Sequence, residues 1–295
     1  MAAGGRIQQQ YAGQLPAGRH GLPRDFVARS QRARILAALV ECVGERGYPE
    51  TRVTDLIARS GVSRKTFYEH FADKEECFLA AYDEAVALLM GHVTAAYEAE
   101  EAWVDAIRAA LRAFLDFLAE HADLTRLCVV DIHAVGSRGV ARRDATIRSF
   151  YYFLDAGRAD APRALPGITA EGVTGGMYEI IYGRAVRGAI RELPRLLPEL
   201  LYWAVMPFLG HDRAVAEMER ARAETQAAPA VPAPAVAPPR RSGRRPSARA
   251  LDGGDEADAV VAVPPRRSGR RRADRRDDAA SGRRSTAARR DDQAT

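Results

Sequence analysis

The side chains best suited to chemistry lie in one short stretch of the chain. Hydroxyl, guanidinium, ammonium, carboxylate and imidazole groups follow one another there, at Ser63, Arg64, Lys65, Thr66, Tyr68, Glu69 and His70. Groups of this kind donate to and accept from the base edges and phosphates of DNA. No Ser/His/Asp arrangement, paired carboxylates, phosphate-binding glycine loop or metal-ligand spacing is visible in the sequence. The sequence therefore predicts nucleic-acid recognition, with no catalytic residue, no metal and no cofactor.

Two short helices joined by a tight turn are expected to position these side chains. Thr54 and Ser63 are placed to cap the two helices, and Gly61 supplies the left-handed conformation that ends the first one. Val62 and Phe67 are spaced as a hydrophobic staple, and Phe71 repeats Phe67 four residues later. One stripe of the second helix then faces inward. Its polar face is free to enter a major groove, as in a helix-turn-helix unit.

The stretch from Gly61 to Tyr68, followed by His70-Phe71 and Asp73-Lys74-Glu75, resembles the signature of TetR-type (tetracycline repressor-like) transcriptional regulators. The resemblance extends upstream through residues 35–38 and 46–48 and covers roughly Phe26 to Tyr82. It implies a homodimer that binds a palindromic operator on double-stranded DNA and is released by a small-molecule effector, most simply as a repressor. The DNA-binding residues that it implies are Thr54, Ser63, Arg64, Lys65, Thr66, Tyr68, Glu69, His70 and Lys74, with Tyr68 and Lys74 on phosphates.

Helical periodicity dominates the rest of the chain up to about residue 222, which predicts an all-α fold. Gly47 closes a first helix, and Asp73 with Glu76 forms a capping box for a long connector helix reaching about Ala99. Further helices are expected around residues 103–118, 124–135 and 147–154. The last two are expected at Thr169–Glu192, which is rich in glycine, and Leu196–His211, which is rich in leucine.

Two surfaces of the second domain follow from the resemblance. Ligand-binding and dimerisation regions belong to this part of TetR-type regulators, and glycines in a helix are best tolerated where another helix approaches closely. The expected ligand pocket is apolar and includes some of Met90, Phe114, Phe117, Tyr151, Met177, Tyr178 and Tyr182, although aromatic stripes of this kind also form ordinary cores. The expected dimer interface includes Leu197, Leu201, Trp203 and Phe208.

Charge and composition suggest four segments: residues 1–24, 25–74, 75–222 and 223–295. Residues 226–295 contain 16 Arg against 9 acidic residues, whereas residues 75–225 contain 16 basic and 23 acidic residues. Both ends lack apolar periodicity and are expected to be disordered. The tail repeats Pro-Pro-Arg-Arg-Ser-Gly-Arg-Arg at 238–245 and 264–271, which could contact DNA or arise by chance in a low-complexity segment. Arg6, Arg19 and Arg24 could follow the DNA backbone from the other end.

The cysteines and the lengths of the apolar runs indicate where in the cell the protein is expected. Cys42, Cys77 and Cys128 are odd in number and widely spaced, which favours buried thiols in a reducing compartment. No signal-peptide pattern and no apolar run of about 18–20 residues is evident, so we expect a soluble cytoplasmic protein at the nucleoid with no membrane partner. The alternative to a regulator is an architectural DNA-binding protein in which the basic tails add non-specific affinity.

Overall fold

The computed structural model describes residues 23–227, and the two tails considered above, including Arg6, Arg19 and the repeated arginine blocks, lie outside that range. Every regular element within residues 23–227 is a helix, as predicted. The α-helices are α2 (Arg24–Arg46), α3 (Val53–Ser60), α4 (Arg64–His70), α5 (Lys74–Glu98), α6 (Trp103–Glu120), α7 (Ala122–Val129), α8 (Ser137–Ser149), α9 (Tyr151–Asp155), α10 (Thr169–Val186), α11 (Leu197–Leu209) and α12 (His211–Ala227). Short 3-10 helices are η1 (Asp131–Val135), η2 (Ala156–Ala159) and η3 (Ile190–Leu196).

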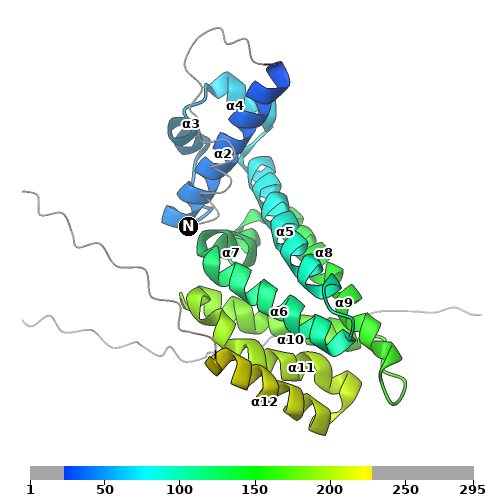
Figure 1. The fold of residues 1–295 in the computed structure, drawn as a ribbon. Coiled ribbons are helices and arrows are strands. Elements are labelled where there is room, and N and C mark those ends of the chain that lie inside the picture. The colour runs from blue at the N-terminus through cyan, green and yellow to red at the C-terminus, as the bar shows by residue number, and fades with distance from the viewer. Residues whose placement is uncertain (1–22, 228–295) are drawn as a thin grey trace, which may run out of the picture. The chain divides into compact units, whose positions relative to one another are not determined.

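The helix-turn-helix geometry follows the predicted turn chemistry at its second helix. Gly61 has φ 66° and ψ 23°, a left-handed conformation that a side chain disfavours. The Ser63 hydroxyl accepts a hydrogen bond from the Thr66 amide at 3.0 Å, and Phe67 and Phe71 are buried. Figure 1 shows α2, α3 and α4 together in one group. The expected recognition helix is therefore α4.

The predicted cap of the first helix at Thr54 is wrong. Helix α3 already begins at Val53, and its N-cap residue is Arg52. The Asp55 carboxylate accepts a hydrogen bond from the Arg52 amide at 2.9 Å, so it satisfies a backbone donor that the helix leaves free. An exposed Thr54 remains on the first turn.

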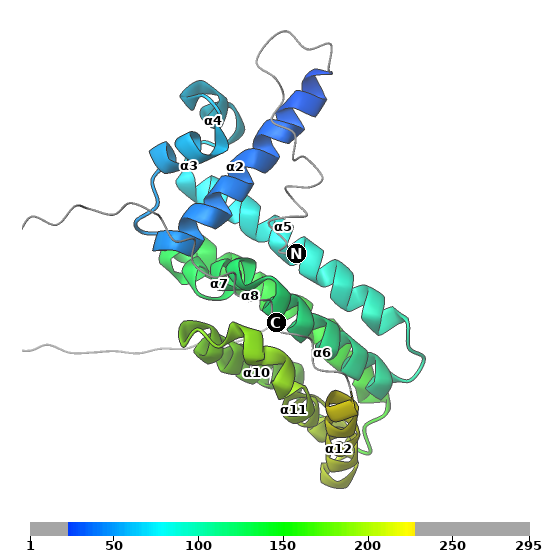
Figure 2. The same cartoon turned by 60° about the vertical axis from the view of Figure 1, so that its left-hand side comes forward.

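Helix α5 connects two hydrophobic cores. Its N-terminal half contributes Cys77 and Phe78 to a core formed with α2, α3, α4, α7 and η1, and its C-terminal half contributes Leu89 and Val93 to a second core. The predicted cap is present, because Asp73 accepts a hydrogen bond from the Glu76 amide at 2.7 Å. Figure 2 shows α5 running from α3 and α4 past α6. The boundary between the cores thus lies inside α5, beyond the predicted domain boundary at residue 74.

Helix α5 is also long and apolar enough to cross a membrane, with a mean hydropathy of 1.2 over an 18-residue window. The prediction concerned an uninterrupted apolar run, and Asp83 and Glu84 interrupt the apolar sequence of α5. Length and composition do not distinguish a membrane span from a core helix, because core helices pass the same test. In α5, 44% of the window is buried within the protein. We therefore describe α5 as a core helix.

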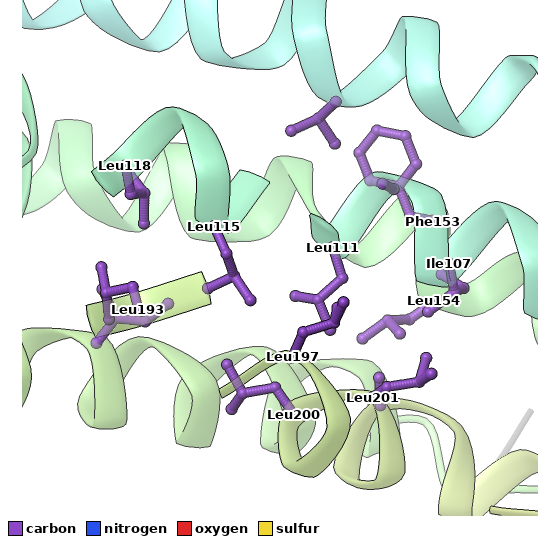
Figure 3. Packing of buried hydrophobic residues seen from close by; sticks show 14 of the residues in the cluster. Ile107, Leu111, Leu115, Leu118, Phe153, Leu154, Leu193, Leu197, Leu200 and Leu201 are labelled. Atoms are coloured by element: carbon purple, nitrogen blue, oxygen red, sulfur yellow. The ribbon is translucent and has the colours of Figure 1, made fainter. Parts of the chain in front are cut away.

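The second core is built largely from branched aliphatic side chains of α6, η3 and α11. Figure 3 shows Leu111 and Leu115 of α6 facing Leu197 and Leu200 of the C-terminal helices. Such side chains recur every three or four residues along α6, so burial of one stripe fixes how that helix is turned. This core supports the cavity described below.

The C-terminal helices differ from the prediction in their bounds. Thr169–Glu192 contains α10 and the start of η3, and a further helix, α12, extends five residues into the segment expected to be a tail. Arg108 of α6 holds α12 through Glu217 at 2.6 Å and is 8% exposed. Because Glu217 lies more than one hundred residues from Arg108 in the chain, local sequence patterns did not reveal this docking.

Helix α8 approaches η1 closely at Gly139. A Cβ atom added at Gly139 would meet the Ile132 carbonyl oxygen well inside contact distance and the Val135 Cβ at 2.9 Å. Glycine is thus required at this contact because even a methyl group has no space. The close approach connects α8 to the core of the helix-turn-helix.

Replacing Gly139 with Ala should lower the free energy of unfolding by about 1–3 kcal/mol, because overpacking a tight contact shifts backbone. The matched control is Gly91→Ala on α5, where a Cβ would meet nothing within 4 Å. This control should be neutral or slightly stabilising, since Ala favours helix over Gly. Urea denaturation of both variants checks the prediction, and equal stabilities would contradict it.

Candidate DNA-binding surface and ligand cavity

Most of the predicted DNA-binding residues belong to α3 and α4, and Lys74 is the first residue of α5. Thr54, Ser63, Arg64, Lys65, Tyr68 and Glu69 are exposed, and Thr66, His70 and Lys74 are partly buried. Lys65 faces Glu69 across one helical turn at 3.8 Å, and the Arg64 guanidinium lies 5.8 Å from the centre of the Tyr68 ring. These weak surface contacts leave the long cationic side chains available to another partner.

Lys74 differs from the other predicted contact residues because it is held inside the protein. Its ammonium donates to the carbonyl oxygens of Tyr48 at 2.9 Å and Thr51 at 2.8 Å, and it lies 4.1 Å from the centre of the Tyr48 ring. Burial lowers the pKa of Lys74, and the more distant Glu50 carboxylate opposes that shift. Lys74 therefore anchors the loop between α2 and α3.

A cavity of about 150 Å³ lies in the second domain. Its wall is mainly aliphatic and aromatic, and α5, α6, α7, α8 and α10 all contribute to it. A volume of this size in an apolar core can hold a molecule such as benzene. The cavity can thus take a compact apolar ligand without rearrangement, and a larger one only if the helices around it move.

Four of the seven predicted pocket residues line this cavity: Phe114, Phe117, Met177 and Tyr178. Met90, Tyr151 and Tyr182 are partly buried against the same core but are not among the lining residues. Arg143 and Cys128 line the cavity and were missed. Burial raises the pKa of the Cys128 thiol to about 12, so the thiol is neutral and contributes as an apolar group.

The 3-10 helix η1 links the cavity wall to the helix-turn-helix core. On one side, His133 Nε2 lies 3.0 Å from the hydroxyl of Tyr178, which lines the cavity. On the other side, the buried Asp131 carboxylate accepts a hydrogen bond from the Tyr48 amide at 3.3 Å, next to the loop that Lys74 anchors. Burial raises the pKa of Asp131, and that hydrogen bond opposes the shift. A short chain of contacts thus joins Tyr178 to the loop between α2 and α3.

Three of the four predicted dimer residues cannot lie on a surface. Leu197, Leu201 and Phe208 are at most 2% exposed within a single chain, because they face α6 rather than outward. Trp203 is 55% exposed and stays available. On α10, the neighbouring helix, a Cβ atom added at Gly172, Gly175 or Gly176 would meet nothing within 4 Å. No helix within residues 23–227 therefore explains those glycines by close approach.

The sequence match falls on the helix-turn-helix. Residues 35–81 match the family model described as bacterial regulatory proteins, tetR family. This segment is therefore a tetR-type helix-turn-helix. The HTH-type transcriptional activator FasR of Mycolicibacterium smegmatis is 35% identical over 100 residues, which cover 34% of this chain and 43% of that protein. An uncharacterised HTH-type regulator of Haemophilus influenzae is 24% identical over 127 residues, covering 43% of this chain and 60% of that protein. The matches thus span less than two thirds of either relative.

Two solved structures share the fold beyond the helix-turn-helix. The fatty acid degradation regulator FadR of Bacillus halodurans aligns with a TM-score of 0.54 at 14% identity, over 59% of this chain and 94% of that one. FadR of Bacillus subtilis in complex with stearoyl-CoA aligns with a TM-score of 0.51 at 15% identity, over 60% and 97%. Identities this low establish a common fold and nothing about the ligand.

Replacing Lys74 with Met should lower the free energy of unfolding by about 1–3 kcal/mol, because two buried carbonyl oxygens lose a charged donor. The control Lys65→Met removes an exposed ammonium of the same length and should change stability by less than about 0.5 kcal/mol. Chemical denaturation of the two variants makes the comparison. Equal losses would show that the Lys74 contacts contribute nothing beyond a surface charge.

Proposed function

We propose that this protein is a homodimeric transcriptional regulator that binds a palindromic operator and responds to a small apolar ligand. The observation that carries the proposal is the exposed polar face of α4, which a capped, rigid helix presents within a tetR-family helix-turn-helix. Cytoplasmic DNA is the corresponding partner. Arg64, Lys65 and Thr66 are placed to reach base edges, and Tyr68 to reach a phosphate. Lys74 would reach the phosphate backbone with the one ammonium proton that its two carbonyl contacts leave unused.

Replacing Lys65 with Ala should change base preference at one position in each half-site by about 1–3 kcal/mol, because a side chain on a base edge discriminates between bases. Sites selected from random DNA, and single-base variants of them, supply the measurement. Arg148→Ala, an exposed cation on α8, is the control and should leave the preference unchanged. If Lys65→Ala weakened binding to all DNA sites equally, Lys65 would contact a phosphate and not a base. Broad, sequence-independent protection in a footprint would favour the architectural alternative.

For the dimer, we propose the open face of α10 together with Trp203 in place of the buried leucines. Three exposed glycines on one helix let a second copy of the same helix approach closely, and the neighbouring Ile180 is 39% exposed. A twofold axis would pair the same patch on both subunits. Each subunit would then present one α4 to a half-site.

The variant Gly176→Arg should be monomeric with unchanged helix content, since a long cation cannot fit where two helices meet. Gly91→Arg on α5 is the matched control, because that glycine is also exposed with nothing near its Cβ position. Light scattering and circular dichroism give mass and helix content. A dimeric Gly176→Arg protein would place the interface elsewhere.

The ligand proposal rests on the apolar cavity. A bound molecule would press on α5, which is itself part of the helix-turn-helix core. It would also press on Tyr178, which is connected to that core through η1. The FadR relative that binds stearoyl-CoA supports an acyl chain as the apolar body. Release of the operator on ligand binding, and hence repression, is the direction we propose, although FasR is named an activator. A reporter gene under the selected operator decides the direction.

A further inference from the structure

Arg143 is the one charged side chain among the residues that line the cavity in the described part of the chain. Along the same stretch, Thr146, Ile147 and Phe150 follow it at spacings of three, four and seven residues and line the cavity too. This spacing places all four on one side of the helical segment. The register of α8 therefore places Arg143 at the cavity wall, among apolar neighbours.

The hydroxyl groups on the same wall already use their single protons within the protein. Thr125 donates to the Leu118 carbonyl at 2.8 Å, Thr174 donates to the Ala170 carbonyl at 2.8 Å, and Tyr82 donates to the Thr146 hydroxyl at 2.9 Å. In turn, Thr146 donates to the Arg142 carbonyl at 3.2 Å, and Tyr178 donates to the Val129 carbonyl at 3.2 Å. A ligand that needs a hydrogen-bond donor finds none unused among these groups, because each hydroxyl carries one proton.

Arg143 retains donors that these hydroxyls lack. Its Nε and Nη2 atoms donate to Asp144 Oδ1 at 3.0 and 2.6 Å, which uses two of the five N–H groups of a guanidinium. The Asp144 side chain is 41% exposed whereas that of Arg143 is 23% exposed, so the present partner lies on the more solvated side. The guanidinium also lies 5.5 Å from the centre of the Tyr178 ring.

We propose that the effector carries one anionic oxygen group on its apolar body, and that Arg143 binds that group. This rests on the ligand-responsive function proposed above. Arginine donates only and keeps its charge, so it favours a carboxylate or phosphate over an alcohol or an ether. Binding there also places the ligand against Tyr178, the first residue of the contact chain through His133 to Asp131.

Titration calorimetry with the full chain tests the proposal using octanoate, its neutral counterpart 1-octanol, and octanoyl-CoA. The wild-type protein should bind octanoate about 10 to 100 times more tightly than 1-octanol, because a charge-assisted hydrogen bond in a covered site is worth that ratio. Arg143→Gln should abolish the difference by weakening octanoate alone. Arg148→Gln, an exposed cation farther along α8, is the matched control and should bind as the wild type does.

Asp144→Asn gives a second variant that acts in the opposite direction. Removing the negative charge of Asp144 weakens its hold on Arg143, so octanoate should bind more tightly by several-fold while 1-octanol is unaffected. This variant keeps the proposal testable even if Arg143→Gln fails to fold. An unchanged or weaker affinity for octanoate in Asp144→Asn would count against a direct contact.

The outcomes separate the two proposals. Equal affinity of the wild-type protein for octanoate and 1-octanol, or equal weakening of both by Arg143→Gln, would overturn the role of Arg143 and leave a ligand-responsive regulator intact. Binding of none of the three probes would overturn the acyl-type effector and the role of Arg143 together. Arg143-dependent binding of octanoyl-CoA without octanoate would support the anionic group and assign it to a phosphate.

Discussion

One packing constraint governs this protein: helix α5 is part of both hydrophobic cores. Phe78 is fully buried against the helix-turn-helix, and fifteen residues later Val93 is buried beside the apolar cavity. Protein interiors are packed as densely as organic crystals, so neither end of such a helix can move without a response in the side chains around it. A change in the cavity at the C-terminal half of α5 can therefore alter the packing of the helix-turn-helix core at its N-terminal half.

The second connection is polar and runs through η1. Ile132 and Val135 belong to the helix-turn-helix core, while His133 faces the cavity wall at Tyr178. The same element holds the loop between α2 and α3 through Asp131, and Lys74 holds it from the other side. Buried charges add little net stability when replaced as a pair, but removing one partner is costly. These two charges hold the loop between α2 and α3 through its backbone.

Groups with unused binding capacity carry the functional proposals. The polar face of α4, the glycine face of α10 and the guanidinium of Arg143 each have capacity that contacts within residues 23–227 do not use. They suit three different partners: a DNA groove, a second copy of the chain and an anionic ligand. Each proposal can fail without the others, because the three surfaces lie on different helices.

Much of the helix-turn-helix was determined by the sequence alone. Gly61, the cap at Ser63 and the Phe67 and Phe71 stripe act over four residues or fewer, and local rules of that range hold before any tertiary contact forms. The all-α class and the cap of α5 at Asp73 followed in the same way. The cap predicted at Thr54 was wrong because α3 begins one residue earlier, and Asp55 accepts the hydrogen bond from the Arg52 amide.

Only the tertiary structure decided which apolar side chains form a core and which line a cavity. Leu201 and Phe208 have the same character as interface residues, and their burial depends on α6, nearly one hundred residues earlier in the chain. The docking of α12 on Arg108 and the position of Arg143 on the cavity wall are long-range facts of the same kind. Periodicity tells which residues share a helical face, but what that face meets is set by packing between distant segments.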